Sequence, residues 1–145
     1  MLRFSIVLKY IKLIYSYLEN IHKDKSISIL CTSGQLKTAA LILIDMLCEA
    51  GCKIYYSGDF DPEGIEIAEK LIQRDKNIVP WCFSKENYRK AISENIISDE
   101  RLKKLDKIEN ICFKELIEEI KKERKAGYQE LLLDKMKKDI EEILN

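Results

Sequence analysis

The chain has 145 residues, enough for one ordinary domain with a hydrophobic core and too few for two large ones. Its 25 basic and 25 acidic side chains cancel, so no overall field attracts it to DNA or to a membrane, and any nucleic-acid contact must be a local patch. Because no apolar run could span a bilayer and the first residues lack a signal-peptide pattern, we expect a cytoplasmic protein without a membrane partner.

The first half of the chain alternates between strand-like and helical patterns. Residues 4–8 and 27–33 are apolar runs typical of strands, and residues 11–21 between them repeat apolar side chains at helical spacing. A second helix is predicted over residues 36–47, with an inner stripe of Leu36, Ala40, Leu43 and Leu47, and Gly51 stands where it should stop.

The same alternation continues to residue 83. Residues 53–59 form a third strand-like run, a third helix is predicted from Pro62, and residues 77–83 form a fourth run. Proline cannot donate to a ladder, so Pro80 marks an edge strand or a strand end. The pattern predicts an α/β domain with a mainly parallel sheet of about four strands, whose carboxyl edge collects Lys9, the stretch "TSGQ" and the stretch "GDFD".

From Ser84 onward the pattern changes to charged, amphipathic helices, and no further strand is predicted. Ser84 and Ser98 are suited to helix N-caps. Gly127 precedes a last helix with one apolar stripe, formed by Leu132, Met136, Ile140 and Ile143. We therefore expect an α/β core over residues 1–97 and a helical extension over residues 98–145, packed on the core or on a partner.

Cysteine and histidine are too few and too scattered for a zinc site. There is one histidine, His22, in a charged stretch, and no Cys-x-x-C pair. The odd number of cysteines predicts reduced, mostly buried thiols that fill the core: Cys31, Cys48, Cys52, Cys82 and Cys112.

The stretch "GDFDPEG" supports two hypotheses. In the first, Asp61 is a helix N-cap, Pro62 is the first helical residue and Glu63 is a favourable first-turn anion. In the second, Asp59 and Asp61 bind Mg²⁺, because residues two apart in an extended segment point to the same side while Phe60 turns into the core. Capping explains Asp61 and leaves Asp59 unexplained.

A different class of enzyme also uses Asp-x-Asp. Phosphatases of the haloacid dehalogenase type place it after their first strand and need a late acidic pair. Here the motif follows the third strand, Pro62 and Glu63 come next, and the chain contains no Asp-Asp. This interpretation is therefore disfavoured.

Four stretches in order carry a resemblance to known proteins: "CTSGQLKTAALILIDML", "YYSGDFDPEGIEIAEKL", "VPWCF…NY" and "GYQELLLDKM". "DFDPEGIEIA" resembles the Asp-x-Asp-Pro-x-Gly segment of Toprim domains in the type IIB topoisomerase A subunit and its meiotic double-strand-break relative. The whole series, from about Ile27 to Met136, resembles the C-terminal domain of Wadjet-type plasmid-defence nuclease subunits (JetD-like proteins). Those proteins carry an additional N-terminal DNA-binding region.

This resemblance implies a Toprim-like fold, a metal-dependent endodeoxyribonuclease activity on double-stranded DNA, and Mg²⁺ or Mn²⁺ as the cofactor. By position, Asp59 and Asp61 would be catalytic and hold the metal, and Glu130 would be a further catalytic candidate. It also implies other defence-complex subunits, or a second copy of the chain, as protein partners.

The turn after the second predicted strand is a candidate phosphate site. Backbone N–H groups at a helix N-terminus favour an anion, so this turn is expected either to bind phosphate or to be a plain strand-to-helix turn. It consists of Thr32, Ser33 and Gly34.

One departure from the Toprim pattern concerns the end of the first strand, where those domains have a glutamate and this chain has Lys9 or a neighbour. At about 4 Å and an effective dielectric near 20, a lysine would interact with Asp59 by roughly 4 kcal/mol and favour an ion pair over a cation. Three explanations remain open: an altered or misassigned N-terminus, a carboxylate supplied by Glu130 or Glu63, or lost chemistry. In the last case the chain would be a non-catalytic interaction module whose helices beyond Ser98 dock onto a partner.

Overall fold

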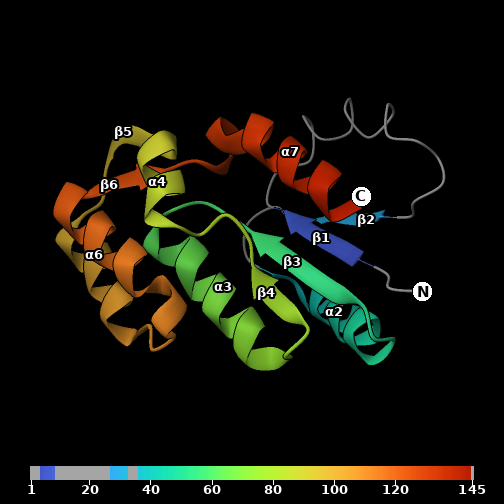
Figure 1. Cartoon of the computed structure of the whole chain (residues 1–145). Helices are drawn as coiled ribbons and strands as arrows, with labels where there is room; N and C mark the ends of the chain where they lie inside the picture. Colours follow the sequence, from blue (N-terminus) through green and yellow to red (C-terminus); the bar gives the residue numbers. More distant parts are fainter. Residues whose placement is uncertain (1–3, 9–26, 33–35, 145) are drawn as a thin grey trace.

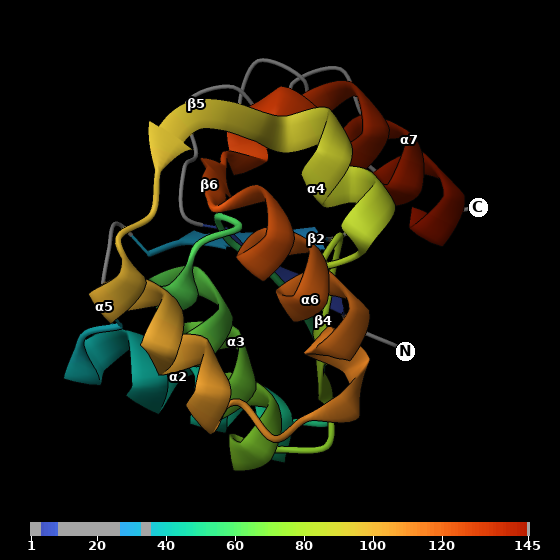
Figure 2. The ribbon, with the colours of Figure 1, turned by 90° about the vertical axis from the view of Figure 1, so that its left-hand side faces the viewer.

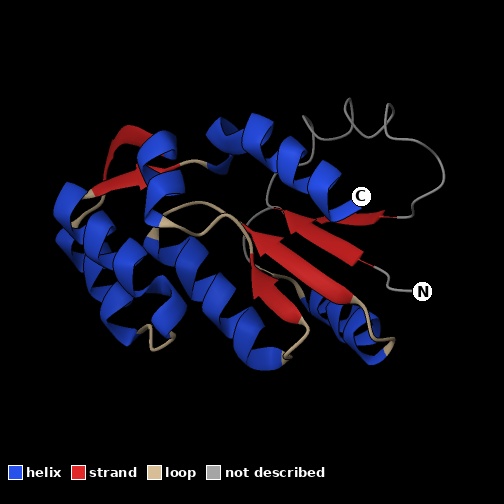
Figure 3. Ribbon diagram, viewed as in Figure 1, coloured by secondary structure: helices blue, strands red, loops and turns tan. Residues whose placement is uncertain are grey.

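The computed structural model describes residues 4–8, 27–32 and 36–144, which form an α/β fold with two sheets (Figure 1 and Figure 3). The predicted helix over residues 11–21, together with Lys9, His22, Ser33 and Gly34, lies outside the described residues. The expectations for these residues stay predictions.

The main sheet has four strands in the order β2-β1-β3-β4, and every neighbouring pair is parallel. The strands are β1 (Phe4–Leu8), β2 (Ile27–Cys31), β3 (Lys53–Ser57) and β4 (Ile78–Pro80). This confirms the predicted α/β class with parallel strands. It also confirms the prediction for Pro80, which is the last residue of an edge strand. At this position the missing backbone N–H removes no hydrogen bond from the interior of the sheet.

Helices cover both faces of the main sheet. α2 (Thr38–Glu49) and α3 (Pro62–Arg74) lie on one side, and α7 (Leu133–Leu144) lies on the other (Figure 1 and Figure 2). The crossover from β3 through α3 to β4 joins two parallel neighbours, as the alternating pattern predicts. α2 contacts β3 and α3 contacts β4, and α7 buries Met136 and Ile140.

The buried faces of α2 and α3 were predicted with different success. On α3 the predicted inner residues Ile65, Ala68 and Leu71 are buried. On α2 the predicted stripe is wrong at Leu43, which is exposed, because Ile44 and Cys48 form the buried face instead. Residues 39–44 are all apolar, so their periodicity cannot distinguish one face from another.

The prediction of no strand after Ser84 is wrong. β5 (Ile92–Ile96) and β6 (Lys125–Gly127) pair antiparallel in a second, two-stranded sheet. Their residues alternate poorly and are mostly polar or small, so they carry no local strand signal. The pairing is made by segments about 30 residues apart and arises from tertiary packing.

The remaining elements gather beyond the carboxyl ends of β3 and β4 (Figure 1). Ser84 and Ser98 cap their helices as predicted, with their hydroxyls accepting from the backbone N–H groups of Asn87 and Arg101. These elements are α4 (Lys85–Ala91), α5 (Asp99–Leu102), α6 (Lys114–Glu123) and the 3₁₀ helices η1 (Lys103–Lys107), η2 (Ile111–Phe113) and η3 (Gln129–Leu132).

The hydrophobic core is shared between the two halves of the chain. Phe83 packs edge-on against both Phe60 and Phe113, with ring centroids 5.9 and 5.7 Å apart. The apolar stripe predicted for the last helix contributes Leu132, Met136 and Ile140, which are all buried. The second half therefore uses its apolar residues to cover the sheet and its carboxyl edge.

The five cysteines are reduced thiols, as predicted, although not all are buried. Cys48 and Cys52 are buried and Cys82 is half-buried, whereas Cys31 and Cys112 are exposed. Burial raises the pKa of the Cys82 thiol to about 12, so it is protonated at neutral pH. Within the described residues, no helix has the length and apolar character needed to cross a bilayer.

Candidate functional site

Asp59 and Asp61 lie between the end of β3 and the start of α3, at the carboxyl edge of the main sheet. Phe60 between them is buried, as predicted, and forms an isolated antiparallel bridge with Gly127. Its backbone N–H donates to the Gly127 carbonyl at 2.9 Å and its carbonyl accepts from the Gly127 N–H at 3.0 Å. This bridge holds the segment after β6 beside the two aspartates.

Asp59 faces the protein interior and is 2% exposed. The backbone N–H of Gln129 donates to its Oδ1 at 3.2 Å. A buried carboxylate is costly unless donors or cations satisfy it, so this contact helps to hold Asp59 in place. It also places Glu130, which follows Gln129 directly, in the segment next to Asp59.

The segment next to Asp59 carries polar atoms that lack partners. Both side-chain atoms of the Gln129 amide and Oε2 of Glu130 are buried without a hydrogen-bond partner among the described residues. Gln129 as a whole is only 4% exposed. Native proteins bury few such groups, and each one invites an explanation by an ion, a water molecule or a ligand.

Asp61 has a different environment from Asp59. Its Oδ1 accepts from the backbone N–H of Gly64 at 2.8 Å, and Pro62 and Glu63 occupy the first turn of α3. The predicted N-cap is therefore confirmed. Its Oδ2 accepts from Nη2 of Arg101 at 3.2 Å, so that Asp61 joins α3 to α5.

Glu63 holds the same guanidinium more closely than Asp61 does. Arg101 donates through Nε and Nη2 to both carboxylate oxygens of Glu63, and Lys104 adds a contact of 2.9 Å to Oε1. The hydrogen bond from Arg101 is the main reason that the pKa of Glu63 falls to about 2. Two carboxylates and two cations thus form a balanced charge cluster at the sheet edge.

Arg101 and Gln129 were not predicted as site residues. Arg101 is 40 residues from Asp61 and Gln129 is 70 residues from Asp59, and neither pair has a local signal. The one available signal was the resemblance around "GYQELLLDKM", which drew attention to Glu130. The structure places the segment that contains Glu130 next to Asp59 through the Gln129 backbone, and the role of Glu130 stays a prediction.

The predicted phosphate-binding turn can be placed only in part. Cys31 and Ser57 pair in register with Leu8 from either side, so Thr32 follows β2 at the same edge where Asp59 follows β3. Thr32 is mostly buried. Since Ser33 and Gly34 lie outside the described residues, phosphate binding by this turn stays a prediction.

The carboxylates of Asp59 and Asp61 at this edge have the chemistry that Mg²⁺ prefers. The segment next to Asp59 adds buried oxygens of Gln129 and Glu130 that have no hydrogen-bond partner among the described residues. No group of three or more His, Cys, Asp or Glu side chains in the described part of the chain is arranged to hold a metal. Mg²⁺ sites often use only one or two carboxylates with water and phosphate, so the donor set fits such an ion. The obstacle is Arg101, which already occupies Asp61.

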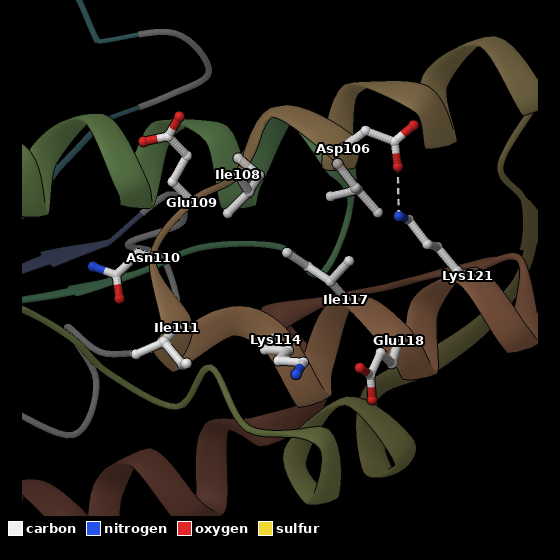
Figure 4. Close-up of a pocket in the computed structure, with 10 residues that line it drawn as sticks. Asp106, Ile108, Glu109, Asn110, Ile111, Lys114, Ile117, Glu118 and Lys121 are labelled. Carbon is white, nitrogen blue, oxygen red and sulfur yellow. Dashed lines mark hydrogen bonds and ion pairs between the residues drawn. The ribbon is translucent and has the colours of Figure 1, made fainter.

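A cavity of about 370 Å³ lies between η1 and α6 (Figure 4). Ile108 and Ile117 form part of its apolar wall, and an ion pair of 2.6 Å between Lys121 and Asp106 lies at its side. None of the predicted site residues lines it. We therefore take the carboxyl edge of the main sheet as the candidate site.

Residues 11–140 match the family described as "Protein of unknown function C-terminus (DUF2399)". The match covers most of the chain, and the protein belongs to this family. No curated protein matches the chain.

Proposed function

We propose that the chain is a Toprim-like, metal-dependent DNA-cleaving domain of a Wadjet-type anti-plasmid nuclease. The observation that carries the proposal is the contact from the Gln129 backbone N–H to Asp59, because it puts the segment that contains Glu130 beside the Asp-x-Asp segment. The parallel sheet supports it, since open α/β sheets place functional groups at the carboxyl ends of their strands. The order of motifs in the sequence supports the assignment to this type of nuclease.

In this proposal each carboxylate has a separate role. Asp59, fixed by the Gln129 N–H, and Asp61, fixed as the cap of α3, hold Mg²⁺ or Mn²⁺. Bound metal would stabilise negative charge on the scissile phosphate and on the leaving oxygen. Glu130 supplies the third carboxylate that Toprim domains take from the end of the first strand. The proposed substrate is double-stranded DNA in the cytoplasm.

The test is a calorimetric titration of the chain with Mg²⁺ and Mn²⁺, followed by cleavage assays on supercoiled plasmid. We expect Asp59→Asn to abolish metal binding and Glu130→Gln to weaken it. Glu66→Gln is the matched control, because Glu66 lies on α3 and forms an exposed ion pair with Lys70. Unchanged metal binding in Asp59→Asn would overturn the proposal.

A second candidate function is a non-catalytic interaction module. Arg101 and Lys104 already neutralise Asp61 and Glu63, which suits a purely structural role for that cluster. The surface first expected for docking, beyond Ser98, is not favoured, because its main apolar residues are buried in the chain's own core. The exposed apolar side chains of α2, Ile42 and Met46, offer a contact surface instead.

Two measurements separate the candidates. The interaction module predicts self-association that Met46→Glu abolishes in sedimentation experiments, with no metal binding. The nuclease domain predicts metal binding and a DNA affinity that falls steeply with salt, because phosphate contacts release counterions.

A further inference from the structure

Arg101 connects the two acidic residues at the start of α3. Its guanidinium reaches Oδ2 of Asp61 at 3.2 Å and contacts both carboxylate oxygens of Glu63. The Arg101 side chain is 38% exposed, whereas that of Asp61 is 17% exposed. The arginine is therefore more accessible to solvent than the carboxylate that it contacts.

The two oxygens of Asp61 are used for different purposes. Oδ1 accepts from the Gly64 N–H and fixes the start of α3, so it is committed to the helix. Oδ2 accepts from Arg101. A divalent cation bound to Asp61 through Oδ2 would lie next to a positive guanidinium, and the two charges repel. Arg101 and the cation therefore compete for this carboxylate.

Glu63 gives Arg101 another place to bind. It contacts Nε and Nη2 of Arg101, whereas the described contact of Arg101 with Asp61 is made by Nη2. Arg101 can therefore release Asp61 and keep its stronger contact with Glu63. Lys104 pairs with Glu63 and makes no ion pair with Asp61 among the described contacts.

We propose that Arg101 is a displaceable cation that occupies Asp61 in the metal-free protein and moves onto Glu63 alone when a divalent ion binds. This inference rests on the proposed metal site at Asp59 and Asp61. Arg101 is a positioning residue, and its competition sets the affinity of the site for the divalent ion. It keeps the negative charge at the sheet edge neutralised until that ion arrives.

The test is a calorimetric Mn²⁺ titration of the full chain and of two variants that each remove one positive charge from the cluster. Arg101→Gln frees Asp61, and we expect it to bind Mn²⁺ about tenfold more tightly than the wild type. Lys104→Gln is the matched control, because it removes a partner of Glu63 only, and we expect its affinity to stay within about threefold. Circular dichroism verifies that both variants are folded.

Two further variants make the result specific. Arg101→Lys keeps the charge but lacks the planar fork that spans two carboxylates, so we expect an affinity between those of the wild type and Arg101→Gln. In an Asp61→Asn background the gain from Arg101→Gln should disappear, because the contested carboxylate is absent.

Each contrary outcome has a distinct meaning. If Arg101→Gln binds Mn²⁺ no better than the wild type while Asp59→Asn abolishes binding, the metal site stands and the role of Arg101 is overturned. An equal gain in Lys104→Gln also overturns it, because the effect would then be general electrostatics. If neither the wild type nor any variant binds Mn²⁺, the proposed metal site falls and the role of Arg101 falls with it.

Discussion

The two sides of the Asp-Phe-Asp segment differ in what they face. Asp59 faces the interior, where it accepts from the backbone N–H of Gln129 and where Gln129 and Glu130 bury polar atoms that lack a partner among the described residues. Asp61 faces a cluster of charged side chains that already satisfies it. Two identical residues, two positions apart, therefore have unlike environments, and the difference comes from the elements packed on either side of them.

We expect the largest effect on stability from Gly64→Ala, because the added Cβ would displace atoms of both Asp59 and Asp61. A Cβ at Gly64 would lie 2.2 Å from the backbone carbonyl oxygen of Asp59 and 3.1 Å from Oδ1 of Asp61. Helix propensity alone predicts a gain of about 1 kcal/mol from this change. Because a backbone atom must shift, we instead expect a loss of about 3 kcal/mol in the free energy of unfolding, measured with urea.

The control for that variant is Gly58→Ala. Its Cβ would meet the Tyr56 hydroxyl at 3.0 Å, which is the end of a side chain. We expect a loss of about 1 kcal/mol there. Equal losses in the two variants would show that the close approach to Asp59 is not the cause.

Asp61→Ala tests the contacts of Asp61 with Gly64 and Arg101. It removes the N-cap of α3 and the contact with Arg101, so we expect a loss of about 1 to 2 kcal/mol in the free energy of unfolding. Asp61→Asn keeps an oxygen that can accept from Gly64, and its loss should stay below about 1 kcal/mol. If both variants lose the same amount, the ion pair rather than the cap is the stabilising contact.

The charge cluster predicts that the free energy of unfolding depends on pH. The pKa of Glu63 is about 2 in the folded chain and has its ordinary, higher value when unfolded. The resulting stabilisation is present above the unfolded pKa and is lost as the pH falls toward the folded one. After solvent screening we expect this contribution to be about 1 kcal/mol.

The measurement for Glu63 compares urea unfolding of the wild type and Glu63→Gln at about pH 6 and about pH 3. The wild type should be more stable than the variant at the higher pH, and the difference should shrink at the lower one. A difference that does not change with pH would contradict the assigned role of Glu63.

Gln129→Met tests the buried amide of Gln129 in the segment next to Asp59, and it has the smallest expected effect. The substitution removes the two amide atoms that lack a partner among the described residues, and it keeps the backbone N–H that donates to Asp59. Replacing an unsatisfied buried polar group by an apolar one is near neutral, so the metal-free stability should change by less than about 1 kcal/mol. The exposed Gln73→Met is the control, and a loss above about 2 kcal/mol at Gln129 would show that its amide is satisfied.

The structure confirms several local predictions from the sequence. The alternation of apolar runs predicted the parallel sheet and α3. In each element the residues that face the core recur at the spacing of a strand or a helix, so the pattern is visible within a few residues. The cap at Asp61 and the inward turn of Phe60 were also predicted, since both depend on residues within three positions. Magnesium binding, phosphate binding and DNA cleavage stay predictions.

The failed predictions concern contacts between distant segments. β5 and β6 have no strand signal of their own, and α2 is apolar on several faces, so only packing decides which side is buried. The predicted site lacked two residues for the same reason. Arg101 follows its partner Asp61 by 40 residues, and Gln129 follows its partner Asp59 by 70 residues.

The sequence by itself determined the class of fold, the place of the two aspartates at the carboxyl edge of the sheet and the suitability of Asp61 as a helix cap. These features follow from spacing, proline and glycine geometry, and local hydrogen bonding. Only the tertiary structure decided what surrounds each aspartate. Charge neutralisation by Arg101 and burial beside Gln129 depend on the three-dimensional packing of the second half of the chain against the first.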